Sequence, residues 1–223
     1  MAWPVGETSV QLDAPAGLLD GVIRMPEKAR AQCVLTHGAG AGIHHENMIG
    51  IAGALAAAGV ASLRFNFPFM QAGRRRVDTN AVAIQSIAYA VETVQAQSAL
   101  PVLLVGHSFG GRMCSHAVAE AQAACCGLIL CSFPLHPSKR PDNKRAEHLT
   151  RVRQPTLFLS GTRDDLALPS WLVPVVEGMP QARLHWLDTA NHSYRVLKRT
   201  RALSLSVFEE MSLEMRRFID ELT

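Results

Sequence analysis

The sequence lacks the segments that direct a chain into or across a membrane. Residues 1–7 hold neither the basic residues nor the apolar stretch of a secretory signal peptide. No apolar run approaches the roughly 20 residues that a membrane span requires. We therefore expect a cytoplasmic protein that does not associate with membranes.

Cysteine is scarce, and its spacing does not suit a metal site. The five cysteines are an odd number, at positions 33, 114, 125, 126 and 131, and none of their spacings is typical of zinc ligands. Four of them fall within apolar patterns, where a free cysteine packs as a small hydrophobic residue. The adjacent pair Cys125 and Cys126 leaves a redox device as an alternative. A reduced protein without a metal is the simplest expectation.

Charge is also modest, and no segment divides the chain. Charged residues make up 18% of the sequence, hydrophobic residues make up 48%, and the formal net charge is +3. We expect no nucleic-acid partner, because such proteins usually carry a basic face or a recognised module, and neither is present. Repeats, low-complexity tracts and linkers are absent as well. A length of 223 residues suits one globular domain over residues 1–223.

Short apolar runs alternate with longer helical patterns, which predicts βα units around a mostly parallel sheet. The runs show no polar alternation, as expected of a sheet covered by helices on both faces. Strands are expected at 33–35, 60–65, 102–105, 128–131, 156–159 and 183–187, with an edge hairpin at 9–12 and 21–25. Helices are expected at about 46–58, 79–97, 110–124, 169–178 and 200–221. The stretch 134–154 is long enough for a short flap but not for a helical lid.

The strongest functional signal is Gly-x-Ser-x-Gly at residues 106–110, between an apolar strand and a helical pattern. A serine on such a sharp turn is exposed at the edge of the sheet, and small neighbours allow main chains to pass closely. The start of the helix also favours negative charge that develops there. A chance match in a structural loop is the alternative, and the strand-turn-helix setting disfavours it. Ser108 is therefore the candidate nucleophile.

A serine hydroxyl needs a base, and the base needs an orienting acid. Residues 160–165 and 189–194 each follow an apolar strand, so both lie where an open α/β sheet collects its site. Among the nine histidines, His192 alone has the expected order and location, whereas His107 adjoins Ser108 and points elsewhere. Asp164 completes Gly-x-x-Asp after its strand and is the favoured acid. Asp165 stays open as the alternative, since it could cap the following turn.

A glycine-rich loop at residues 37–42 follows another apolar strand. Acyl transfer needs two backbone N–H donors aimed at the developing oxyanion. We expect one from Phe109, next after the nucleophile, and the other from Ala39 in this loop. A phosphate-binding loop is the competing interpretation, but Gly-Lys-Ser/Thr is missing at the required spacing.

Several residues near these loops are candidates for substrate contact. Aromatic and apolar residues at 68–70, together with Trp171, could form an apolar wall. Arginines could bind a carboxylate or phosphate on the substrate, although solvated surface charge is the simpler interpretation. The substrate-contact candidates are His37, Gly40, Phe69, Arg74, Arg112 and His136.

The combined motifs resemble those of a known family. They are the loop 37–42, Arg-Phe-Asn-Phe-Pro-Phe at 64–69, Ala-Gly-Arg at 72–74, Gly-His-Ser-Phe-Gly-Gly-Arg at 106–112, Phe-Pro-Leu-His-Pro at 133–137, Glu-His-Leu at 147–149 and Gly-Thr-Arg-Asp at 161–164. Together they resemble a poorly characterised α/β-hydrolase family related to dienelactone hydrolases. It includes a testis-expressed hydrolase-like protein and a domain of a chromatin acetyltransferase-complex subunit. The resemblance spans roughly residues 30–195.

This resemblance implies the α/β-hydrolase fold, with a mostly parallel central sheet of about seven or eight strands, helices on both faces and no large lid. It also implies Ser108, Asp164 and His192 as a catalytic triad. Dienelactone hydrolases use a cysteine nucleophile where this chain has Ser108, so their lactone substrate is not implied.

The sequence thus predicts a serine hydrolase that cleaves a small soluble ester, thioester or related acyl bond without a cofactor. A hydrolase-fold binding or scaffold protein is the alternative, because some members of the wider group have no known substrate. Substrate choice and oligomeric state depend on loop shapes that motif spacing does not fix.

Overall fold

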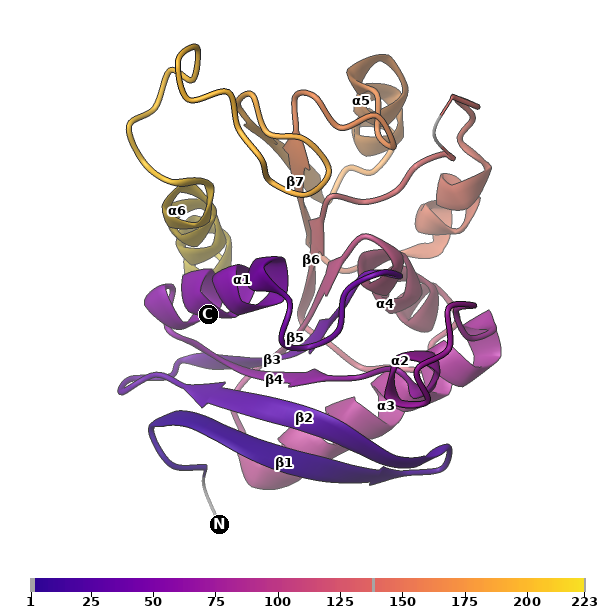
Figure 1. The fold of residues 1–223 in the computed structure, drawn as a ribbon, viewed down its shortest axis with the longest axis vertical. Helices are drawn as coiled ribbons and strands as arrows, with labels where there is room; N and C mark the ends of the chain where they lie inside the picture. Colours follow the sequence, from indigo (N-terminus) through magenta and orange to yellow (C-terminus); the bar gives the residue numbers. More distant parts are fainter. Residues whose placement is uncertain (1–2, 138, 223) are drawn as a thin grey trace.

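The computed structural model describes residues 3–137 and 139–222 of the chain (Figure 1). The strands found there are β1 (Gly6–Ala14), β2 (Gly17–Met25), β3 (Ala31–Thr36), β4 (Val60–Phe65), β5 (Val102–His107), β6 (Gly127–Cys131), β7 (Thr156–Gly161) and β8 (Ala182–Leu187). The helices are α1 (Glu46–Ala57), α2 (Pro68–Gln71), α3 (Asn80–Gln97), α4 (Phe109–Ala119), α5 (Pro169–Glu177) and α6 (Val207–Asp220), with a 3₁₀ helix η1 (Lys144–Arg151).

Within the described residues, the eight strands form one sheet in the order β1-β2-β4-β3-β5-β6-β7-β8. The strands from β4 to β8 in this order run parallel, while β1 and β2 form an antiparallel hairpin that joins the edge of β4. The carboxyl ends of the parallel strands therefore meet at one edge of the sheet, as an open α/β sheet requires of its functional loops.

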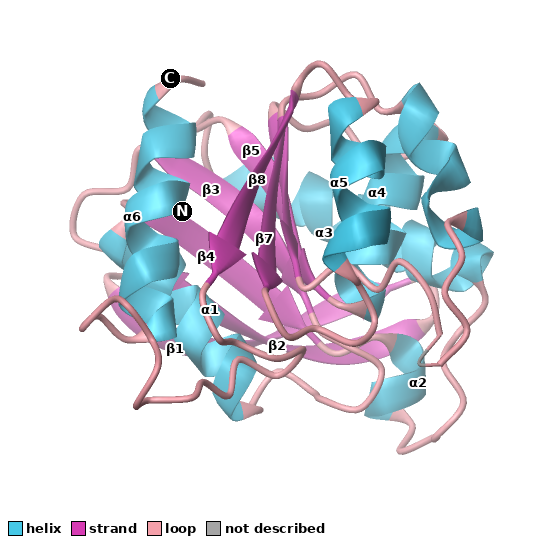
Figure 2. Ribbon diagram, turned by 90° about the horizontal axis from the view of Figure 1, so that it is seen from above, coloured by secondary structure: helices cyan, strands magenta, loops and turns pink. Residues whose placement is uncertain are grey.

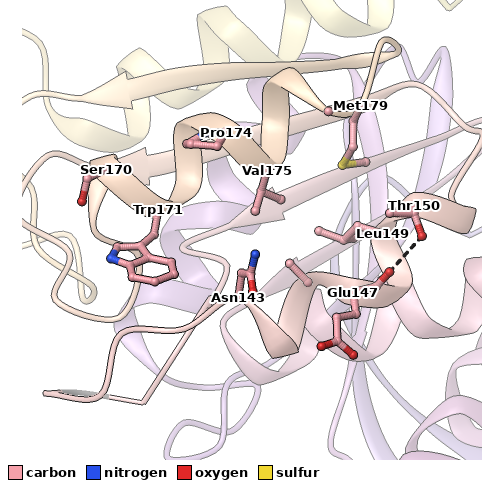
Figure 3. A pocket seen from close by; sticks show the side chains of 11 residues that line it. Asn143, Glu147, Leu149, Thr150, Ser170, Trp171, Pro174, Val175 and Met179 are labelled. Carbon is pink, nitrogen blue, oxygen red and sulfur yellow. Dashed lines mark hydrogen bonds between the residues drawn. The ribbon is translucent and has the colours of Figure 1, made fainter.

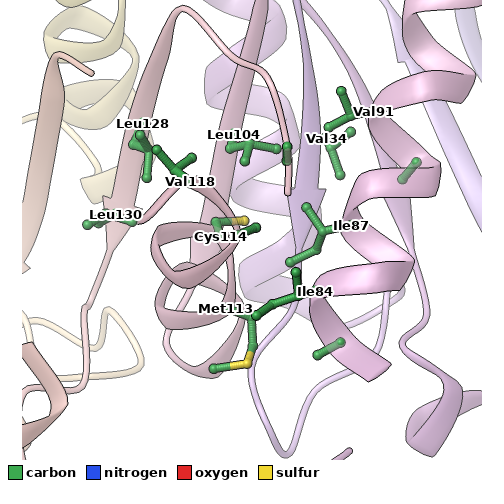
Figure 4. Close-up of a cluster of buried hydrophobic side chains, with 14 of the residues drawn as sticks. Val34, Ile84, Ile87, Val91, Leu104, Met113, Cys114, Val118, Leu128 and Leu130 are labelled. Carbon is green, nitrogen blue, oxygen red and sulfur yellow. The ribbon is translucent and has the colours of Figure 1, made fainter. Parts of the chain in front are cut away.

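Helices cover both faces of the sheet (Figure 2). Alternate residues of a strand point to opposite faces, so each buried strand contributes to two separate cores. In β3, for example, Val34 packs against α3 and α4, whereas Cys33 and Leu35 pack against α1 and α6. Figure 4 shows the first core, where side chains of α3 and α4 meet those of β3, β5 and β6. This two-sided burial explains why the central strands are apolar without alternation.

The predicted sheet is confirmed, including the hairpin at its edge, and most strands extend one to three residues beyond their apolar runs. The last helix differs more, because it begins at Val207 instead of near Thr200. Ser206 accepts a hydrogen bond from the N–H of Glu209, and the side chain of Glu209 accepts one from the N–H of Ser206. This capping box fixes the first turn of the helix. Leu203, which the apolar pattern assigns to the helix, lies in the preceding loop.

Two short helices were not predicted from the sequence. The single turn α2 begins at Pro68, whose fixed φ suits the first position of a helix. The 3₁₀ helix η1 lies in the stretch expected to form a flap, and it packs beside α4. The helix expected at 110–124 stops at Ala119, and Ala121 adopts a positive φ of 54° just beyond it. No helix in the described part of the chain is long and apolar enough to cross a membrane.

Candidate active site

Ser108 lies at the turn between β5 and α4, with φ of 53° and ψ of −118°. A positive φ is uncommon for a residue with a side chain, so this conformation must be held by its surroundings. The N–H of Ser108 donates to the carbonyl of Cys131 at 2.9 Å, and its own carbonyl accepts from the N–H of Arg112 at 3.1 Å. The turn is thereby fixed between β6 and the first turn of α4, and Ser108 is only 9% exposed.

Glycine is required on both sides of this serine because main chains approach closely. A Cβ atom on Gly106 would lie 2.4 Å from the backbone nitrogen of Gly111. A Cβ atom on Gly110 would lie 2.6 Å from the carbonyl oxygen of Thr36. Both distances are far shorter than van der Waals contact. The strand-turn-helix unit can therefore close only with these small residues, as the sequence motif predicts.

The structure places three polar side chains from separate loops in one hydrogen-bonded chain. His192 follows β8, and its Nε2 atom lies 2.9 Å from Oγ of Ser108. Its Nδ1 atom lies 2.8 Å from Oδ2 and 3.0 Å from Oδ1 of Asp164, which follows β7. A carboxylate only accepts hydrogen bonds, so Nδ1 carries a proton and donates to Asp164. Nε2 is then free to accept the hydroxyl proton of Ser108.

Asp164 and Asp165 differ sharply in their surroundings. Asp164 is 1% exposed, and its Oδ1 also accepts a hydrogen bond from the N–H of Leu166 at 2.9 Å. Asp165 is exposed. The geometry thus associates His192 with Asp164 and not with its neighbour.

The loop that carries His192 is held in place from two directions. A Cβ atom on Gly161, at the end of β7, would lie 2.2 Å from the carbonyl oxygen of Ala190. The loop therefore passes directly over the end of β7. The side-chain Oδ1 of Asn191 accepts hydrogen bonds from the N–H groups of Ser193 and Arg195, each at 3.0 Å. These contacts fix the backbone on both sides of His192.

His107 also supports this loop, which sequence reasoning missed. Its Nε2 atom lies 3.2 Å from the carbonyl oxygen of His192, and its ring packs 5.4 Å from the ring of Tyr194. Burial, reinforced by the charge of His192, lowers the pKa of His107 to about 4. The imidazole is therefore neutral near pH 7, and Nε2–H donates to the carbonyl. In the sequence, only the position of His107 directly before Ser108 points to a role in the site. Its hydrogen-bond partner, the carbonyl of His192, comes from a distant loop.

An aromatic cluster lies beneath the glycine-rich loop. His37 is fully buried, with Nδ1 2.8 Å from the carbonyl oxygen of Gly38 and Nε2 accepting from the N–H of Phe67 at 2.9 Å. Burial lowers the pKa of His37 to about 4, so its ring is neutral near pH 7. Phe69 is also fully buried and packs edge-on against Phe109 at 5.9 Å. His37 and Phe69 therefore support the site from below instead of lining its surface.

The residues expected to supply oxyanion donors lie on two segments near Ser108. Phe109 is the first residue of α4, and N–H groups in the first turn of a helix have no acceptor within that helix. Ala39 and Gly40 form an exposed turn after β3. A Cβ atom on the preceding Gly38 would lie 3.4 Å from Cβ of Ser108, so this loop lies directly against the serine.

The remaining candidates for substrate contact lie in different environments. Arg74 is about half exposed and forms an ion pair with Asp78 at 2.8 Å. His136 is fully buried, and its Nε2 accepts from the N–H of Leu168 at 3.4 Å. His136 therefore fixes the segment after Asp164 and does not face solvent. Arg112 is partly exposed on α4, one helical turn after Ser108.

A pocket of about 620 Å³ lies between η1 and α5, away from the hydrogen-bonded side chains of Ser108, His192 and Asp164 (Figure 3). Leu149 and Glu147 border it from η1, and Trp171 and Val175 border it from α5. Neither Ser108 nor His192 lines this pocket. Trp171, expected in an apolar wall of the substrate site, lines this pocket. In the described part of the chain, no group of three or more His, Cys, Asp or Glu side chains is placed to hold a metal ion.

Solved structures show the same architecture. A serine hydrolase without a lid from Xanthomonas campestris is 21% identical, with a TM-score of 0.72 over 100% of this chain and 95% of that one. A serine hydrolase homologue from Coxiella burnetii is 17% identical, with a TM-score of 0.75 over 100% of both chains. A dienelactone hydrolase from Anabaena variabilis is 18% identical, with a TM-score of 0.75 over 96% of this chain and 97% of that one.

These likenesses show that the fold is that of α/β-hydrolases, as the sequence predicts. A family model described as an alpha/beta hydrolase domain matches residues 29–220, which is most of the chain. The matched region contains the serine turn, the buried aspartate and the histidine loop. The chain belongs to the alpha/beta hydrolase domain family.

Proposed function

We propose that this protein is a serine hydrolase that cleaves a small, soluble ester, thioester or related acyl bond through an acyl-enzyme. The observation that carries the proposal is the continuous chain of hydrogen bonds from Asp164 through His192 to Ser108, at 2.8 and 2.9 Å. Nucleophile, base and orienting acid lie within hydrogen-bond reach of one another, as this chemistry requires.

In the proposed reaction, Oγ of Ser108 attacks the acyl carbonyl while Nε2 of His192 takes the hydroxyl proton. Asp164 holds the imidazole in the required tautomer and stabilises the imidazolium that forms. The backbone N–H groups of Phe109 and Ala39 donate to the oxyanion. His192 then returns the proton to the leaving group, and a water molecule, activated in the same way, releases the acid from Ser108.

Support for a small soluble substrate comes from the access to the site. Where the structure describes the stretch between β6 and β7, it holds one 3₁₀ helix of eight residues, η1, which packs beside α4. The likeness to a hydrolase described as lacking a lid agrees with this arrangement. A lipase hides apolar surface beneath a lid, whereas the described residues of this stretch form no element larger than η1. We also propose that the protein belongs to the narrower family that includes the testis-expressed hydrolase-like protein.

The test is covalent labelling with a fluorophosphonate probe, which reacts with an activated serine. We expect labelling of the wild-type protein at the peptide that contains Ser108. Ser108→Ala should lose both labelling and hydrolysis of an activated ester while keeping its circular dichroism spectrum. Ser193→Ala, close to His192 but outside the hydrogen-bonded chain, serves as the matched control and should keep both. An unlabelled wild-type protein would instead favour the binding or scaffold function.

A further inference from the structure

The face of α4 that begins at Ser108 continues into a cluster of basic side chains. Arg112 and His116 follow Ser108 at four-residue steps, so the three positions share one face of the helix. Each step advances about 6 Å along the axis. The helix η1 packs beside α4 and carries Arg145, His148 and Arg151. Residues three apart eclipse one another in a 3₁₀ helix, so these side chains also share a face.

Two stacked histidines join the two helices. The rings of His116 and His148 lie 3.6 Å apart with an interplanar angle of 11°. This stack shows that the face of η1 with His148 is turned toward α4, and Arg145 and Arg151 flank His148 on that face. Ser115 gives its hydroxyl proton to the carbonyl of Arg112 at 2.8 Å, so Nε2–H of His148 donates to the hydroxyl oxygen, also at 2.8 Å.

The histidines add no charge to this cluster near neutral pH. Burial, together with the neighbouring His116, Arg112 and Arg151, lowers the pKa of His148 to about 3. Burial and Arg112 also lower the pKa of His116. Glu120 is the carboxylate close to the stack, with Oε1 3.4 Å from Nδ1 of His116.

Arg112 has an unmet requirement for an acceptor. Its Nε atom is shielded from solvent and has no hydrogen-bond partner among the described residues. The arginines whose side chains are buried are paired, because Arg64 bonds to Glu7 at 3.1 Å and Arg201 bonds to Glu210. Arg112, Arg145 and Arg151 form no ion pair with any residue in the described part of the chain. A shielded N–H donor that lacks an acceptor is costly, even where the rest of the side chain reaches solvent.

We propose that Arg112, Arg145 and Arg151 form a binding site for a phosphate or carboxylate group beside the serine turn. The planar guanidinium group donates two parallel hydrogen bonds to such an anion. The stacked histidines join α4 and η1, so that each helix presents arginines on the side that holds the stack. That the anion belongs to the acyl substrate rests on the proposed hydrolase function, whereas the binding site itself does not.

The binding experiment uses inorganic phosphate and the full-length Ser108→Ala protein, which excludes turnover. Phosphate is titrated at pH 7 and constant ionic strength, with chloride as the balancing salt, and ¹H–¹⁵N spectra are recorded. We expect saturable shifts in the amide signals of α4 and η1. Arg112→Gln should raise the dissociation constant about tenfold or more, since it removes a charged hydrogen-bond donor.

A second variant keeps the test decisive if Arg112→Gln disturbs packing. The double variant Arg145→Gln/Arg151→Gln changes side chains on η1, of which Arg151 is exposed, and it should weaken binding to a similar degree. Arg153→Gln removes the same charge from an exposed residue just after η1 and should leave the dissociation constant unchanged. Absence of saturable shifts, or equal weakening in the control and the double variant, would overturn the proposal.

The source of the anion is decided by kinetics on the wild-type enzyme. If the substrate carries it, phosphate should inhibit ester hydrolysis competitively, and an ester with a carboxylate on its acyl part should have a higher kcat/KM than a neutral ester of equal length. Arg112→Gln should reduce that preference. Saturable binding without competition would support the site and assign it to a separate ligand. A protein without esterase activity would contradict the proposed function but leave the binding result to stand.

Discussion

Replacing Asp164 with Asn tests whether the buried carboxylate sets the tautomer of His192. The carboxylate accepts from Nδ1 of His192 at 2.8 Å and from the N–H of Leu166 at 2.9 Å. An asparagine keeps one acceptor oxygen, and the Leu166 N–H engages it. The new amide donor then faces Nδ1, so the imidazole must carry its proton on Nε2. In that tautomer His192 cannot take the proton of Ser108.

The expected loss in turnover is on the order of 10⁴, the magnitude seen when the orienting aspartate of another serine hydrolase is changed to asparagine. A factor of 10⁴ corresponds to about 5.4 kcal/mol of transition-state stabilisation. The loss should appear in kcat, because the substitution leaves the binding loops in place. Asp165→Asn makes the same change in an exposed neighbour and should leave kcat near that of the wild type.

Initial rates on 4-nitrophenyl acetate over a range of concentrations measure both effects. Thermal unfolding of each variant verifies that the fold is intact. The reasoning fails if Asp164→Asn stays within about tenfold of the wild-type kcat, or if Asp165→Asn is the crippled variant.

Three further predictions follow from the geometry of the site. Gly161→Ala should lower kcat/KM by at least tenfold, because a Cβ atom 2.2 Å from the carbonyl of Ala190 must displace the histidine loop; unchanged kinetics would show that the loop is compliant. The free energy of unfolding should fall between pH 6.5 and pH 4, by up to about 1.4 kcal/mol per pH unit each for His37 and His107. The reason is that, as the pH falls, the unfolded chain takes up these protons before the folded protein does. Urea titrations at a series of pH values measure the effect, and the account would be contradicted if His107→Asn left the dependence of the free energy of unfolding on pH unchanged. Rates on esters of rising chain length should saturate smoothly across the solubility limit, and a jump there would mean that some segment closes over Ser108.

The central parts of the fold and site were predictable because local signals agree with the global structure. The uninterrupted apolar runs are dictated by burial on both faces of the sheet. Gly106 is dictated by a contact within the strand-turn-helix unit and Gly110 by the neighbouring strand β3, and both leave their mark in the local spacing of the motif. The expected positions of Asp164 and His192 needed only the rule that loops at the carboxyl ends of parallel strands converge.

The features that were missed depend on contacts between distant segments or on competing local signals. His107 supports the loop of His192, which lies 85 residues further along the chain. No local pattern reveals that contact. The apolar spacing of α6 extends back toward Thr200, which predicts a helix that begins too early. The capping box of Ser206 and Glu209 fixes the start at Val207 instead, and both of its residues are present in the sequence.

Several candidates for substrate contact are buried in the structure and support loops instead. His37 and His136 occur in motifs near the site, but both are fully buried and bonded to backbone groups. A histidine that fixes a loop and one that lines a pocket look the same in sequence. Arg112 differs because its basic neighbours come from η1, a 3₁₀ helix that the polar composition of its segment did not predict.

The most direct test of the central claim is detection of the acyl-enzyme. Rapid mixing of the protein with an excess of 4-nitrophenyl acetate should give a burst of nitrophenol close to one equivalent if deacylation is the slower step. Acid quenching and peptide mass spectrometry at early times should then locate the acetyl group on Ser108. Neither a burst nor an adduct in Ser108→Ala is expected. An acetyl group on another residue, or hydrolysis by the wild-type protein that survives in Ser108→Ala, would contradict the account.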